Sequence, residues 1–226
     1  MSLITDLKAI TPKYGHHISR GSVDIHERDA SATVTKVTWL NSDFNCIDTQ
    51  MIKDSTSFFE ICQAPDLFRK DCDGIIMFEH AGKKFMFLTE LKSGFSTQFL
   101  YKAKTQLVAS FIKANMLLHL LPSYHQEDYI VKGFIVSHSP TDDFLTTLHQ
   151  ATSLPYNSKQ RQEYSLAMRL LIDNRKTKST AMLPTDFSCL RSLPLGQRGI
   201  FPKMDLHFIE VPSGQSSITL DINDYI

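Results

Sequence analysis

Hydrophobic residues are densest between residues 73 and 139 of the 226-residue chain. Three segments there are apolar at odd and even positions alike. This pattern is typical of strands that helices cover on both faces of a sheet. We therefore expect central strands at residues 73–79, 84–92 and 129–139.

Apolar residues recur at helical spacing in several other segments. The clearest is 96–121, which Ser96 or Thr97 can cap and which Pro122 follows. Shorter helices are expected at 48–64, 142–151 and 158–174, and further strands at 30–40 and 204–212.

The order helix, strand, strand, helix, strand, helix predicts an α/β fold with a central mixed sheet flanked by helices. A chain of this length fits one domain, which we assign to residues 1–226. Its core region covers about 48–140, and residues 141–226 extend the same domain with helices and a strand.

Charge and composition exclude several classes of protein. The 24 basic and 24 acidic residues give zero net charge, so no global field attracts nucleic acid. No apolar run approaches the ~20 residues of a membrane span, and the N-terminus lacks the pattern of a signal peptide. The four scattered cysteines indicate free thiols, which favours a cytoplasmic protein. The nine histidines form no metal motif, and no glycine-rich phosphate loop indicates a nucleotide cofactor.

The hairpin "DGIIMFEHAGKKFMFLTELK" carries charges at its open end. If Ala81 and Gly82 form a two-residue turn, Asp73 lies opposite Glu90, and Lys92 shares their face of the sheet. Opposed carboxylates have Cβ atoms ~5 Å apart and repel each other. Mg²⁺ or Mn²⁺ would offset that repulsion. The alternative is a salt bridge, in which Lys92 neutralises one acid while the other points to solvent.

The segments "DCDGIIMF" and "FLTELKSG", followed by a helix, resemble the PD-(D/E)XK nuclease superfamily. Glu90, Leu91 and Lys92 match its (D/E)-x-K element over a region of about residues 50–140. The resemblance implies a restriction-endonuclease-like core. Cys72 precedes Asp73, where the family pattern has proline, and Asp71 is a nearby rival acid.

The resemblance also implies roles for single residues. Asp73 and Glu90 would bind Mg²⁺ or Mn²⁺, together with the backbone carbonyl of Leu91. Lys92 would orient the attacking water and stabilise charge at the scissile phosphate. Glu60, on the preceding helix, would be a further acid of the site. Gln106, on the following helix, would be a site residue, although the tyrosine found in the exonuclease branch is missing.

The sequence thus predicts a metal-dependent nuclease acting on DNA, with endonuclease favoured over exonuclease. Many standalone nucleases of this family belong to restriction or other anti-phage systems in which partner subunits control them, so the resemblance implies the effector subunit of a bacterial defence complex, with protein partner subunits or a homo-oligomer. The alternative is a non-catalytic subunit of the same fold that binds nucleic acid or a protein partner. Residues that could contact phosphates are Lys102, Lys104, Lys113, Arg161, Arg169, Arg175, Lys176 and Lys178.

Overall fold

The computed structural model describes residues 2–27, 29–191 and 193–226. Its helices are α1 (Leu3–Ile10), α2 (Thr49–Ile61), α3 (Thr97–Leu118), α4 (Asp142–Thr152) and α5 (Lys159–Met168). Its strands are β1 (His17–His26), β2 (Lys36–Ile47), β3 (Gly74–His80), β4 (Lys83–Lys92), β5 (Tyr129–His138), β6 (Ser179–Met182), β7 (Met204–Val211) and β8 (Ser217–Asp221).

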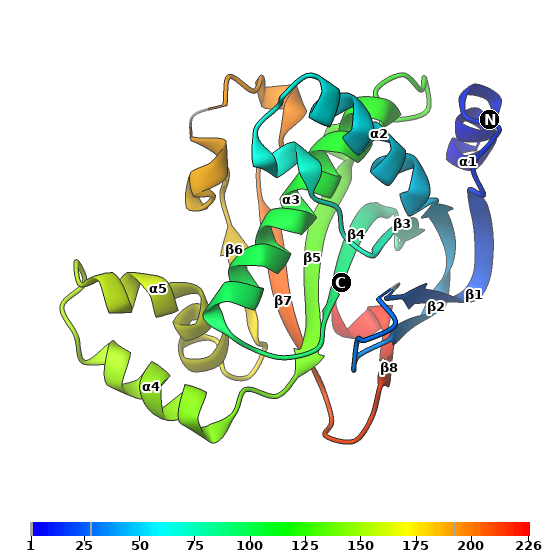
Figure 1. Cartoon of the computed structure of the whole chain (residues 1–226). Coiled ribbons are helices and arrows are strands. Elements are labelled where there is room, and N and C mark those ends of the chain that lie inside the picture. The colour runs from blue at the N-terminus through cyan, green and yellow to red at the C-terminus, as the bar shows by residue number, and fades with distance from the viewer. Residues whose placement is uncertain (1, 28, 192) are drawn as a thin grey trace.

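The strands form a mixed sheet in the order β1-β2-β3-β4-β5-β7-β6, with β8 alongside β2. Strands β4, β5 and β7 run parallel, whereas the β1–β2, β2–β3, β3–β4 and β6–β7 pairs are antiparallel. Helix α3 crosses one face of the sheet, and α4 and α5 form a lobe at the lower left of Figure 1. The predicted central mixed sheet flanked by helices is confirmed.

Hydrophobic cores lie on both faces of the sheet. On the helix face, Leu88 of β4 packs in one cluster with Met51 of α2 and Leu107 of α3. On the opposite face, Trp39 is fully buried against Phe87 and Phe134. Because both faces of the central strands are covered, these strands lack polar alternation, as the sequence pattern indicated.

Elements outside the motif region differ more from expectation. The strand expected at 30–40 begins instead at Lys36 and continues through polar residues to Ile47, and Asn41 adopts a positive φ of 74° within it. The helix expected at 158–174 ends at Met168, and the chain continues as a wider π-type turn over Arg169–Asp173. Helix α1 and strands β1, β6 and β8 were not anticipated.

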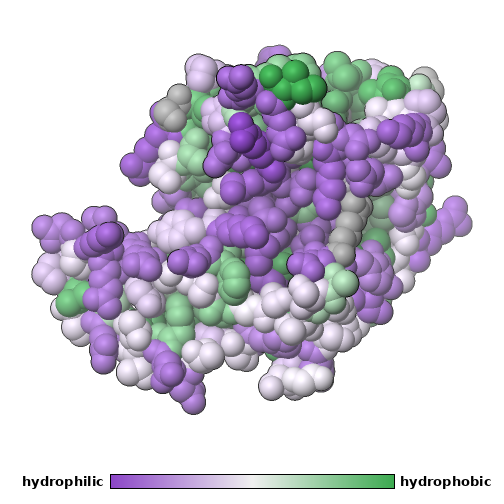
Figure 2. All heavy atoms as spheres, in the orientation of Figure 1, coloured by the Kyte–Doolittle hydropathy of each residue, from purple (hydrophilic) through white to green (hydrophobic). Residues whose placement is uncertain are grey.

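Hydrophilic residues cover much of the face shown in Figure 2, and the surface hollows beside the lobe of α4 and α5. Within the described ranges, no helix combines the length and apolar character that crossing a membrane requires.

Candidate active site

The β3–β4 hairpin closes through a two-residue turn at Ala81 and Gly82. Both residues have positive φ, 48° and 74°, as a type I′ turn requires. His80 therefore pairs with Lys83, and the antiparallel register continues from there to the open end of the hairpin. This is the register predicted from the sequence.

Asp73 lies just before β3, at the open end of the hairpin. Its N–H donates to the Thr89 carbonyl at 3.0 Å, and its carboxylate oxygen Oδ2 accepts the N–H of Leu91 at 2.8 Å. These two bonds hold the Asp73 backbone and side chain against β4. Continuing the β3–β4 register by one pair places Asp73 opposite Glu90, and the side chains of directly opposed residues lie on the same face of the sheet.

Glu90 is almost fully enclosed, with 1% of its surface exposed. Its Oε1 atom forms an ion pair with Nζ of Lys92, a side chain that is only 11% exposed. Its Oε2 atom is buried and has no hydrogen-bond partner. The ion pair of the salt-bridge alternative is thus present between Lys92 and Glu90, although Asp73 bonds the Leu91 N–H instead of pointing to solvent.

The surroundings favour the protonated form of both acids. Burial raises the pKa of Asp73 to about 6, although the Leu91 N–H acts in the opposite direction. Burial, followed by the charge of Asp73, raises the pKa of Glu90 well above its usual value. Two carboxylates that are both costly to ionise would both gain from a bound cation.

Helix α3 fixes the segment that leads into Asp73. Gln106 donates through Nε2 to the carbonyl of Asp71 at 2.9 Å, and its Oε1 is buried without a partner. The hydroxyl of Ser110 accepts the N–H of Cys72 at 2.7 Å. Gln106 thus positions the chain before Asp73, and Asp71 is held by its backbone beside the helix.

Gly74 is required by a close approach of β1. A Cβ atom built at Gly74 would lie 2.5 Å from Cδ1 of Ile25, well inside van der Waals contact. The glycine of the Asp-Gly pair therefore lets β1 cross the start of β3. This crossing brings the end of β1, and with it Glu27, towards the two carboxylates.

Glu27 and Lys53 are two charged residues that act on the acids and that the sequence did not indicate. The charge of Glu27 raises the pKa of both Asp73 and Glu90, whereas Lys53 of α2 lowers that of Asp73. Glu27 is held by its N–H, which donates to the Thr35 carbonyl at 3.0 Å. No local motif marks either residue, because their proximity arises only from the packing of β1 and α2 around the hairpin.

The connection between β1 and β2 reaches across to the end of β4. Thr33 donates its N–H to Oγ of Ser93 and its hydroxyl to the Ser93 carbonyl, both at 3.0 Å. Ser93 directly follows Lys92. The end of β4 is thus tied to the segment that follows Glu27.

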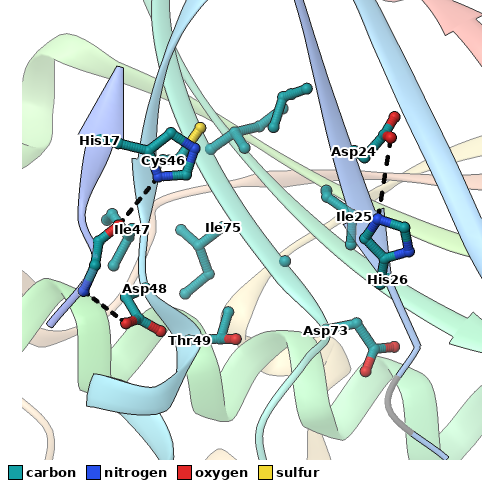
Figure 3. A pocket seen from close by; sticks show the side chains of 14 residues that line it. His17, Asp24, Ile25, His26, Cys46, Ile47, Asp48, Thr49, Asp73 and Ile75 are labelled. Atoms are coloured by element: carbon teal, nitrogen blue, oxygen red, sulfur yellow. Dashed lines mark hydrogen bonds and ion pairs between the residues drawn. The ribbon is translucent and has the colours of Figure 1, made fainter. Parts of the chain in front are cut away.

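A hollow of about 370 Å³ lies beside Asp73, between β1, β2 and the start of β3. Figure 3 shows His26 and Asp24 on one side and His17 and Asp48 on the other, with the Asp73 side chain at the rim and directed away from the centre. No lysine or arginine lines this hollow within the described part of the chain. Its walls therefore do not favour a phosphate group.

Glu60 does not join the cluster. It is exposed near the C-terminal end of α2, while Lys53, two turns earlier, is the α2 residue that acts on Asp73. The expectation that a helix glutamate completes the site is not supported. The additional acid near the cluster is Glu27, which follows β1.

Four of the basic residues expected to contact phosphates have internal partners instead. Lys104 is buried and donates to the Asp186 carbonyl, and fully buried Lys113 donates to Oγ1 of Thr56 at 2.8 Å. Arg161 donates to the carbonyls of Thr152 and Leu154 at the end of α4, and Arg169 to Thr180, Ala181 and Asp186. These four residues hold helices and loops together, which corrects the sequence expectation.

The other four basic residues are more accessible. Lys102, Arg175 and Lys176 are exposed. Lys178 is half-buried and forms an ion pair with Glu210. Any phosphate contact by the expected residues therefore falls to this smaller set.

The acidic C-terminal tail does not fill the site. Tyr225 packs edge-to-face on Trp39 and Phe134, on the sheet face opposite the helices. Asp73 and Glu90 share their face with Ile75 and Leu88, which belong to the helix-side core. The tail and the carboxylates are therefore separated by the sheet.

The donor set fits one kind of metal better than others. Among the described residues, no group of three or more His, Cys, Asp or Glu side chains is placed to hold a metal ion. Mg²⁺ commonly binds one or two carboxylates and completes its shell with water and substrate phosphates. The unpartnered Oε2 of Glu90, beside Asp73, fits that mode of binding.

Comparisons with protein-family models, with curated proteins and with solved structures gave no match.

Proposed function

We propose that the chain is a Mg²⁺- or Mn²⁺-dependent nuclease of PD-(D/E)XK type that hydrolyses phosphodiester bonds, with DNA as its substrate. The observation that carries the proposal is the convergence of Asp73, Glu90 and Lys92, in which Oε2 of Glu90 is buried without a partner. The sheet order around the hairpin is compatible with a restriction-endonuclease-like core.

Asp73 and Glu90 would hold the metal ion, with the backbone carbonyl of Leu91 as a further ligand. When bound, the ion would lower the pKa of a coordinated water and stabilise charge on the phosphate. Lys92 is held beside Glu90 and can donate a hydrogen bond to the attacking water or to the phosphate. Glu27 adds negative charge near the same point and could accept a proton.

The test is incubation of the purified protein with plasmid, linear and single-stranded DNA, and with RNA, in Mg²⁺ or EDTA. Lys92→Met keeps much of the side-chain volume and should lower metal-dependent cleavage by about 10²–10³-fold, the usual loss for one electrostatic stabiliser. Lys84→Ala is the matched control, because Lys84 lies on the same strand and pairs with Asp128 at the surface. Equal cleavage by Lys92→Met and wild type would refute the assignment.

A protein partner that presents the nucleic acid is part of this proposal. The chain has zero net charge, and four of its expected phosphate-binding residues have internal contacts. Apolar side chains are exposed near the ends of α2 and α3, namely Phe58, Ile61, Met116 and Leu120. Exposed apolar side chains bind a partner where they form one contiguous patch. A bacterial defence complex in the cytoplasm would supply such a partner.

A non-catalytic subunit is the second candidate, because the Glu90–Lys92 ion pair is self-contained and nearly closed to solvent. The two candidates differ in metal binding. A nuclease site should give a Mg²⁺- or Mn²⁺-dependent rise in melting temperature that Asp73→Asn removes. A protein that shows neither this rise nor cleavage belongs to the second class.

A further inference from the structure

A second cavity of about 450 Å³ lies between α4, the turn after α5 and the end of β7. Part of its lining is apolar, and we call that part, which includes Leu145 and Ile172, the apolar floor. Three basic or imidazole side chains also line the cavity. The lining residues used here are Leu145, His149, Ile172, Arg175, Lys178 and Glu210.

The cavity lies on the same sheet face as the candidate active site. Lys92 of β4 is paired with Ser137 of β5, which is paired with Glu210 of β7. Residues paired across parallel strands point to the same side. Neighbouring strands are ~4.8 Å apart, so Glu210 lies roughly 10 Å from Lys92 along this row. The cavity and the candidate active site are therefore neighbours on this face of the sheet.

Lys178 is held in an unfavourable backbone conformation at this cavity. Its φ is 45°, the left-handed region that favours glycine. Its N–H donates to the Asn174 carbonyl at 2.7 Å, and its carbonyl accepts the N–H of Phe208 at 2.8 Å. Strain of this kind tends to persist at functional sites.

The charges of the cavity distinguish it from the hollow beside Asp73. Arg175 is exposed, and Lys178 shares its charge with Glu210, which also accepts from Ser139. One full positive charge therefore remains for an anionic ligand. The apolar floor at Leu145 and Ile172 offers a surface for a flat, uncharged group.

We propose that this cavity binds one unpaired nucleotide of the substrate strand, with its phosphate at Arg175 and Lys178 and its base on the apolar floor. This inference rests on the proposed nuclease function and makes it more specific. A base inside a duplex cannot reach the floor, so the preferred substrate is single-stranded DNA or a duplex with a single-stranded end.

The test measures the affinity for a fluorescent single-stranded oligonucleotide in EDTA. Fluorescence anisotropy reports binding at salt concentrations from about 50 to 200 mM. Arg175→Ala should weaken binding about fivefold and lower the slope of log K against log salt by about 0.7, the value for one lost phosphate contact. Lys176→Ala is the matched control, because this exposed neighbour does not line the cavity. Lys178→Gly should weaken binding without lowering the melting temperature.

Equal affinities for Arg175→Ala and Lys176→Ala would overturn the inference. The inference would also fail if polyglutamate displaced the oligonucleotide as strongly as unlabelled DNA does, because the cavity would then be a site for acidic peptides. If Arg175→Ala weakened the binding of blunt duplex DNA as much as that of the single-stranded oligonucleotide, the cavity would not bind an unpaired base. Binding is measured without cleavage, so these outcomes stay separate from the Lys92→Met test of catalysis.

Discussion

Replacing Asp73 with asparagine should make the metal-free protein more stable at neutral pH. Burial raises the pKa of Asp73 from 3.8 to about 6, so ionising it in the folded state is unfavourable. A pKa difference of about 2 corresponds to about 3 kcal/mol, an upper value because the side chain is only partly buried. Asparagine keeps the size and an oxygen that can accept the Leu91 N–H, but carries no charge.

The stability difference between Asp73→Asn and wild type should depend on pH. Well below pH 3.8 the carboxyl is protonated in both states, so it does not affect the relative stability of wild type. As pH rises from 3.8 to 6, the unfolded chain releases its proton first and the wild type loses stability. The advantage of Asp73→Asn should therefore be near its full value at pH 7.5, and about half of that at pH 5.

Urea denaturation in EDTA at both pH values measures this difference. At full value it corresponds to roughly 6–12 °C in melting temperature for a chain of this size. Mg²⁺ should reduce the difference, because it stabilises only the wild type. Asp54→Asn is the control. Hydrogen bonds from Gln50, Tyr14 and Lys13 lower the pKa of Asp54, so removing this carboxylate should not stabilise the protein. If Asp73→Asn is no more stable than wild type at pH 7.5 without metal, the reasoning fails.

Two further substitutions test how the site is held in place. Gly74→Ala should destabilise the protein by about 1–3 kcal/mol, because the new methyl group would overlap Ile25. In a double-mutant cycle measured by urea denaturation, Ile25→Ala should restore much of this loss. Additive effects of the two substitutions would contradict the contact. Ser110→Ala should cost about 1–3 kcal/mol by leaving the buried N–H of Cys72 unpaired, and should also slow cleavage. A cleavage rate that Ser110→Ala leaves unchanged would show that α3 does not position Asp73.

The sequence predicted the hairpin and its register because local rules determine both. Ala81 and Gly82 fit a type I′ turn, and that turn fixes every pair up to Gly74 and Thr89. The central strands were recognisable for a similar reason, since both of their faces are buried. The acid at Asp73 could therefore be placed opposite Glu90 by counting alone.

Strand β1 was not predictable in the same way. Only Val23 and Ile25 are buried along it, so its residues show no sustained alternation. Its place in the sheet depends on pairing with β2, which itself runs through polar residues around Asn41. Glu27 became visible as a neighbour of the carboxylates only once this pairing was known.

Lysines on α3 show why charge counted along a sequence overstates a binding surface. Lys102 is exposed, whereas Lys104, two residues later, is buried under Phe187, and Lys113 is enclosed at the side of α2. Burial lowers the pKa of both buried lysines, which is an energetic cost and not a gain in phosphate affinity. Only the exposed cations release counterions when nucleic acid binds. The isolated chain should therefore bind DNA with a shallow salt dependence, and a steep one would require a basic partner surface.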